Sequence, residues 1–182
     1  MTLRKAVVGF FHEEGIKFQE TEDEQVIRLG AVGKNGFFET FVSVDEDARE
    51  VAFWTLIPLK APPDRFRDLA EVLVWANGNA RFGAFAMSRK TGDIAFRTAV
   101  LFGSQEPDVG ILRHLLFGCW SHADTSAKPI AAVLCAGLSP EQVIRTAEQE
   151  REDDRLPTKS KGGPSLQDRS GRLGDLLGGS NN

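Results

Sequence analysis

Hydrophobic residues near the N-terminus recur every three or four positions, a spacing typical of a helix with one apolar face. This spacing predicts a helix over Leu3–Glu14, and four extended runs follow it. Short polar turns separate the runs, which favours an antiparallel meander. The predicted strands are Ile16–Gln19, Val26–Val32, Phe37–Val44 and Glu50–Pro58.

The rest of the chain returns to helical spacing, with one further hairpin. Pro62-Pro63 opens a helix that ends near Asn77, because proline is tolerated in the first turn of a helix. Two strands joined by a polar turn follow, and then three helices. The strands are Phe82–Met87 and Ile94–Phe102, and the helices run from Val109 to a break near Asp124, from Ala127 to Ala136 and from Pro140 to Arg151.

This order of elements predicts an α+β domain, with an antiparallel sheet of about five strands flanked by helices in the order α-βββ-α-ββ-α-α. The domain is expected to cover residues 1–151. Residues 152–182 contain no aromatic residue, many glycines and mixed charges. Such a composition buries too little apolar surface to fold alone, so we predict a disordered C-terminal tail.

The strand pair between Phe37 and Pro58 departs from simple alternation, because both faces of each strand carry apolar residues. In the first strand, Phe37 and Phe41 point one way and Phe38 points the other. A sheet with one wet face should alternate apolar and polar residues, so both faces of this pair are expected to be covered. The helices cover one face, which leaves the other for more of the chain, a second copy or a partner.

Composition narrows the class of protein. With 182 residues, 41% of them hydrophobic, the chain can build one ordinary core. A net charge of −4 disfavours nonspecific binding to nucleic acid or anionic membranes. Met1–Gly15 lacks the pattern of a signal peptide, and Cys119 and Cys135 fall in predicted helices, so we expect reduced thiols and a cytoplasmic protein.

Several local stretches together resemble the YbjN-like proteins, often labelled bacterial sensory transduction regulators, over about Leu3–Glu148. That family is similar in fold to type III secretion chaperones, which are usually dimeric and hold a client segment without chemistry. The resemblance implies a noncatalytic binding or regulatory protein and supplies no catalytic residue. The stretches are Phe41-Val42-Ser43-Val44 with Val51-Ala52-Phe53-Trp54, Pro62-Pro63 with Trp75-Ala76-Asn77-Gly78-Asn79, Phe82-Gly83-Ala84-Phe85 with Gly92-Asp93-Ile94-Ala95-Phe96-Arg97, and Ala136-Gly137-Leu138-Ser139-Pro140-Glu141-Gln142.

Residues that could carry chemistry each have a simpler structural explanation. Cys119 and His122 could supply half of a zinc site, but a tetrahedral site needs further ligands and no C-x-x-C exists. Ser121-His122-Ala123-Asp124 contains the residue types of a hydrolytic triad, yet a triad converges from separate elements and a polar helix end suffices here. We therefore predict that the protein is not an enzyme and binds no metal or cofactor.

Three ligand-binding patterns are also weak. Asn77-Gly78-Asn79 with Arg81 suits the end of a helix better than a ligand site. Gly30-Ala31-Val32-Gly33 lacks the lysine and hydroxyl residue of a phosphate loop and precedes a strand. The aromatic strands have the chemistry of an RNA-binding sheet, but Phe37–Trp54 contains one basic residue against five acidic ones.

The prediction is a homodimeric, chaperone-like module that holds a client protein segment. The helices Leu3–Glu14 and Val109–Ala136 are expected to cover one side of the sheet, and the helix Arg65–Asn77 or the second hairpin to meet a twin subunit. A ligand-sensing domain or a protein associated with single-stranded nucleic acid is the alternative function. The predicted partner-binding groove is lined by Phe53, Trp54, Phe85 and Phe96, for which core positions are the alternative.

Overall fold

A computed structural model describes residues 2–155 of the chain. The chain divides into two compact units, Met1–Glu148 and Gln149–Asn182, and the predicted tail from residue 156 onward lies outside the described residues. The elements are α1 (Leu3–Glu13), β1 (Phe18–Glu20), β2 (Val26–Val32), β3 (Phe37–Asp45), β4 (Glu50–Lys60), the short 3₁₀ helix η1 (Pro63–Arg65), α2 (Phe66–Gly78), β5 (Ala84–Met87), β6 (Asp93–Leu101), α3 (Val109–Leu134) and α4 (Pro140–Arg155).

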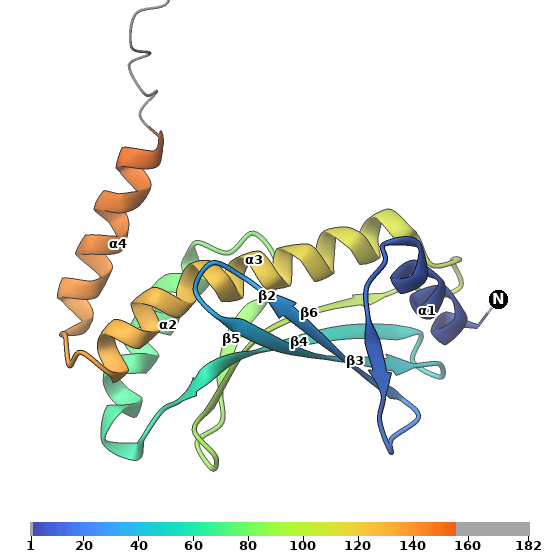
Figure 1. The fold of residues 1–182 in the computed structure, drawn as a ribbon, viewed down its shortest axis with the longest axis horizontal. Helices are drawn as coiled ribbons and strands as arrows, with labels where there is room; N and C mark the ends of the chain where they lie inside the picture. Colours follow the sequence, from blue (N-terminus) through green and yellow to red (C-terminus); the bar gives the residue numbers. More distant parts are fainter. Residues whose placement is uncertain (1, 156–182) are drawn as a thin grey trace, which may run out of the picture. The chain divides into compact units, whose positions relative to one another are not determined.

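The strands form one antiparallel six-stranded sheet in the order β1-β2-β3-β4-β6-β5. Helices α1 and α3 lie on the same side of this sheet, and α2 packs beside α3 and β5 (Figure 1). The predicted α+β class and antiparallel sheet are confirmed. The sheet has six strands where about five were expected, because the short run before β2 forms the three-residue strand β1.

The core lies between the sheet and helices α1 and α3. The apolar stripe of α1 is fully buried, and the side chain of Thr2 caps its first turn by accepting the N–H of Lys5 at 3.3 Å. Alternate residues of the central strands meet this stripe, as the period of a strand requires. The large, fully buried side chains are those of Leu3, Phe10, Phe11, Ile27, Phe38, Phe53, Leu69, Ile94, Phe96, Leu112, Leu116 and Ile130.

The predicted break near Asp124 is wrong, because α3 is one helix of 26 residues that continues through Pro129. Its buried residues recur every three or four positions along its whole length, from Leu112 to Val133. Packing of this stripe on β4 and β6 outweighs the helix-breaking tendency of Pro129 and of the polar run that begins at Ser121. Packing against the sheet therefore decides that the helix continues past Asp124, which the local sequence alone does not determine.

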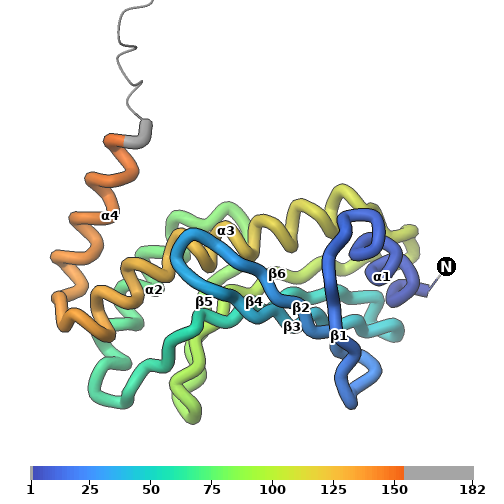
Figure 2. The backbone as a smooth tube through the Cα atoms, in the orientation of Figure 1, coloured from blue at the N-terminus to red at the C-terminus, as the bar shows by residue number. Residues whose placement is uncertain are grey.

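The β2–β3 turn passes beside α3 (Figure 2), and Asp124 of α3 fastens it there. Its Oδ1 atom accepts the backbone N–H of Asn35 at 2.7 Å, and the side-chain amide of Asn35 donates to the carbonyl oxygen of Asp124 at 3.0 Å. A Cβ atom on Gly33 would lie 2.4 Å from Oδ1 of Asp124, so the close approach requires glycine. Asp124 thus holds a hairpin turn in place.

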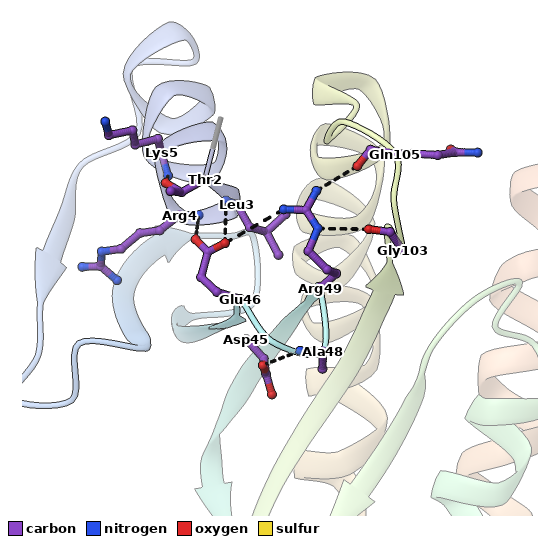
Figure 3. A network of polar contacts seen from close by, with 10 residues as sticks. All are labelled: Thr2, Leu3, Arg4, Lys5, Asp45, Glu46, Ala48, Arg49, Gly103 and Gln105. Carbon is purple, nitrogen blue, oxygen red and sulfur yellow. Dashed lines mark hydrogen bonds and ion pairs between the residues drawn. The ribbon is translucent and has the colours of Figure 1, made fainter.

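The β3–β4 turn is fastened in a similar way to the start of α1 (Figure 3). The carboxylate of Glu46 accepts the backbone N–H groups of Leu3 at 2.9 Å and Arg4 at 2.8 Å. These two donors lower the pKa of Glu46, against a smaller opposing effect of burial. Arg49 ties the same turn to the loop after β6 by donating to the carbonyl oxygens of Gly103 at 3.0 Å and Gln105 at 2.9 Å.

Candidate functional site

The four residues predicted to line one groove lie on different faces of the sheet. Phe53 and Phe96 are 0% exposed and Phe85 is 6% exposed, and all three belong to the core on the helix-covered face. Trp54 points to the opposite face and is 36% exposed. A shared groove is therefore corrected to a single surface candidate, because neighbouring strand residues point to opposite faces.

The sheet face opposite α1 and α3, hereafter the open face, carries Trp54 in the middle of a row. Strand register places Arg28 of β2, Phe41 of β3, Trp54 of β4 and Arg97 of β6 directly beside one another. Within the unit Met1–Glu148, no helix covers this row (Figure 1). The row thus places two aromatic rings between two arginines, and we call it the central row.

Each arginine of the central row is held by a carboxylate on the same face. The guanidinium of Arg97 lies 4.8 Å from the centre of the Trp54 ring, and its Nη2 atom lies 3.3 Å from Oε1 of Glu50. Arg28 forms an ion pair with Glu39. Exposed ion pairs contribute little to stability, whereas a cation over an indole ring shields and orients it. The aromatic centre of the face is therefore flanked by neutralised charges.

A second exposed ring, Phe37, lies over β2 and separates two hollows. A Cβ atom on Gly30 would lie 2.7 Å from Cζ of Phe37, so the ring occupies the space that a side chain at Gly30 would need. The larger hollow, of about 860 Å³, lies between the end of α1, β1 and β2. The smaller, of about 360 Å³, lies beside Leu56 and Pro58 of β4. Both hollows are open to solvent.

The candidate chemical residues of α3 have structural roles. Burial raises the pKa of the Cys119 thiol, and the thiol donates to the carbonyl oxygen of Phe96 at 3.2 Å. The ring of His122 stacks on Phe96 with centroids 4.7 Å apart. Across residues 2–155, no three histidine, cysteine or acidic side chains are grouped as a metal site.

Asn77, the other polar candidate, closes the edge of the sheet. Its Oδ1 atom accepts the backbone N–H of Phe85 at 2.6 Å, and its Nδ2 atom donates to the carbonyl oxygen of Phe85 at 3.2 Å. Asn79 caps α2 by donating to the carbonyl oxygen of Trp75 at 2.8 Å. The sequence identified this segment as a helix end, but not its contact with β5, which depends on tertiary structure.

Sequence reasoning missed Arg97, Arg28 and their carboxylate partners. These residues come from separate strands, so only the register brings them together. The available signal lay in the Ile94–Phe102 run, where the basic residue Arg97 has a small residue two positions away on either side. Among the described helices, none has both the length and the apolar character needed to cross a membrane.

Comparison with known proteins identifies the fold. The family model "YbjN: Putative bacterial sensory transduction regulator" matches residues 4–126. The crystal structure of YbjN, "a putative transcription regulator from E. coli", is 10% identical with a TM-score of 0.54, covering 71% of this chain and 90% of that chain.

Two solved protein complexes are also similar. The ExsC–ExsE complex matches at 12% identity and a TM-score of 0.50, covering 70% of this chain and 96% of that chain. The HopA1–SchA chaperone–effector complex matches at 13% identity and a TM-score of 0.48, covering 66% of this chain and 88% of that chain. No curated protein matches the sequence. The expected likeness in fold to type III secretion chaperones is confirmed.

Proposed function

The chain belongs to the YbjN family, and from this premise we propose that it is a noncatalytic, chaperone-like protein-binding module. The observation that carries the proposal is the open face, where half-buried Phe41 and exposed Trp54 lie between two arginine–carboxylate pairs. An aromatic centre with a polar rim is the usual anatomy of a protein interface. A protein–protein complex, that of ExsC with ExsE, has a similar fold, which supports the same kind of partner.

The proposed form is a homodimer that holds a segment of a client protein. The open face leaves large apolar side chains partly in water: Phe37 is 57% exposed, Val32 86% and Leu101 68%, besides Trp54. Covering what remains exposed of these four side chains would contribute together about 5 kcal/mol before the cost of association. A gain of this size favours an association that forms and separates over a permanent one.

The polar residues of α3 support a noncatalytic role. A nucleophilic cysteine needs a lowered pKa and access to solvent, whereas burial raises the pKa of Cys119. The carboxylate of Asp124 binds a turn and the ring of His122 stacks on Phe96, so both side chains have structural contacts. The polar side chains of α3 thus pack in the core or hold a turn.

The test replaces residues of the open face in the full chain. Trp54→Asp and Phe37→Asp should keep the circular dichroism spectrum of the wild type, because both side chains are exposed and Arg97 lies beside position 54. Both variants should lose dimers in analytical ultracentrifugation and lose the proteins that the wild type retains from a native lysate. Ile111→Asp, on an exposed position of α3 outside both the open face and the helix Arg65–Asn77, is the matched control.

The proposal would be contradicted if both open-face variants retained the dimer and the same bound proteins as Ile111→Asp. A wild-type chain that stayed monomeric at every concentration would remove the homodimer alone. Binding of single-stranded nucleic acid, the other function considered, is disfavoured because Arg28 and Arg97 are each neutralised by a carboxylate and cannot both serve phosphates.

A further inference from the structure

The larger hollow, of about 860 Å³, lies where the chain passes from α1 to β1. Gly15, with a φ of +66°, ends α1, and the N–H of Ile16 donates to the carbonyl oxygen of Phe11 at 2.8 Å. The floor of the hollow belongs to the core, because Phe11 is 0% exposed and Leu29 is 2% exposed. Small-molecule sites have volumes of about 300–1,000 Å³, so the hollow has the size of such a site.

Aromatic rings line the hollow on two sides. On the side of α1, the ring of Phe18 lies 5.6 Å from the ring of Phe11 and 5.4 Å from the ring of His12, measured between centroids. On the side of β3, the ring of Phe37 lies over Gly30, as described above. We call these two groups of rings the aromatic walls. Rings of this kind supply a large and rigid apolar area to a molecule placed between them.

The hollow offers a ligand side chains and no free strand edge. Continuing the β1–β2 register by one residue places Lys17 opposite Gly30, so β1 occupies the edge of β2 beside the hollow. An added strand would find no unpaired backbone groups there. A ligand is therefore held by apolar contact with the aromatic walls and by the charge that the lining carries.

The lining of the hollow has an excess of one positive charge. Its charged residues are two cations, Lys17 and Arg28, and one anion, Glu39. Arg28 pairs with Glu39, whereas Lys17 makes no ion pair with any described residue. The smaller hollow has the opposite balance, with Lys60 against Glu39 and Asp93. An anionic group is therefore favoured at the larger hollow and disfavoured at the smaller one.

We propose that the larger hollow binds a small amphipathic carboxylate, with its apolar body between the aromatic walls and its carboxylate beside Lys17. The site goes beyond the proposed protein-binding function and does not rest on it. Arg28 and Phe37 belong both to the hollow and to the open face, so the bound carboxylate lies next to the surface proposed to meet a partner. For that reason neither residue serves as a test variant.

The probe is dansyl-undecanoic acid, a fatty acid whose fluorescence rises on transfer from water to an apolar site. Decanoate and the uncharged decanol are used to displace it from the full chain, which gives a dissociation constant for each. Lys17→Met removes the charge and keeps the apolar stem, so it should weaken decanoate about three- to fivefold and leave decanol unchanged. Lys17→Arg should retain decanoate. Lys34→Met, at an exposed lysine outside the hollow, controls for net charge and should change neither constant.

Two further readouts test the apolar part and the location of the site. Phe18→Ala removes part of an aromatic wall and should weaken decanoate and decanol alike, by about five- to tenfold. Because Phe18 also packs against the core, urea unfolding must first show that this variant is folded. In NMR spectra of isotope-labelled wild type, decanoate should shift the amide signals of Gly15, Lys17 and Gly30 and leave those of the β5–β6 turn in place.

Three results would overturn the inference. The first is equal affinity of Lys17→Met and Lys34→Met for decanoate. The second is a wild-type chain from which decanoate at about 1 mM, the weak end of specific affinities, displaces no probe; loss of lysate proteins by Lys17→Met would then assign the hollow to a partner protein. The third is that Trp54→Ala weakens decanoate as much as Phe18→Ala does, which would assign the binding to the open face. In each case the proposed function stands if Trp54→Asp still abolishes retention of proteins from the lysate.

Discussion

Replacing Thr98 with valine should make the protein more stable. The hydroxyl of Thr98 is buried on the covered face of β6 and has no hydrogen-bond partner among the described residues. Two other threonines on that face, Thr40 and Thr55, join their hydroxyls at 2.8 Å, and Trp120 donates its indole N–H to Thr40 at 2.9 Å. Threonine-to-valine substitution can therefore be compared on one sheet face where the hydroxyl is hydrogen-bonded and where it is not.

The magnitude follows from what each substitution removes. An unsatisfied buried hydroxyl costs about 1–3 kcal/mol, so Thr98→Val should raise the free energy of unfolding by about 1–2 kcal/mol. Thr55→Val breaks one hydrogen bond and should lower it by about 1 kcal/mol. Thr40→Val also leaves the half-buried indole N–H of Trp120 without its protein partner, and should cost about 2 kcal/mol. The predicted order of stability is Thr98→Val, wild type, Thr55→Val, Thr40→Val.

The assay is urea unfolding of the full chain, followed by circular dichroism and tryptophan fluorescence. Equal slopes against urea across the four proteins would show that the compactness of the denatured state is unchanged. The melting temperature of Thr98→Val should rise by about 2–8 °C in a chain of this size. The reasoning is refuted if Thr98→Val is less stable than wild type, or if the three valine variants do not differ.

Three other substitutions test the turns that position the sheet. Gly83→Ala should cost more than about 2 kcal/mol, because φ is +72° and the Cβ would lie 2.4 Å from a backbone oxygen of β6; Gly78→Ala, with open space, is its control. Asp124→Ala should lower the free energy of unfolding by about 1–2 kcal/mol and speed amide exchange in the β2–β3 turn. The pKa of Glu46 is lowered from 4.5, so the ionised carboxylate adds to the free energy of unfolding above pH 4.5 and loses this contribution on acidification. The stability advantage of the wild type over Glu46→Gln should therefore shrink below pH 4.5.

The arrangement of strands could be predicted because each strand has its own apolar alternation and a polar turn on either side. Val26–Val32 was predicted with the bounds that the structure has, and Phe37–Val44 differs by one residue. The break in α3 could not be decided locally. Proline and polar residues near Asp124 favour an end, and only the contact of α3 with the sheet favours continuation.

The candidate site was harder to predict because both sheet faces are apolar. Alternation places Phe53 and Trp54 on opposite faces, but the sequence does not say which face the helices cover. The structure settles this by packing α3 on the side of Phe53, so that Trp54 stays at the surface. The pairing of Arg97 with Glu50 depends on the register of strands far apart in the sequence, for which no local signal exists.

The charged flanks of the open face bear on how a partner is selected. A partner that covers Trp54 must also cover the guanidinium of Arg97, which already bonds Glu50 and loses its hydration on contact. That desolvation opposes the gain from covering the ring, so a merely apolar partner gains little. A partner that supplies a carboxylate or carbonyl oxygen to Arg97 avoids the loss, because it replaces the water that it displaces. In the proposed function, the open face would therefore discriminate by hydrogen bonding at Arg97, while the Trp54 ring would supply apolar area to any partner that meets this condition.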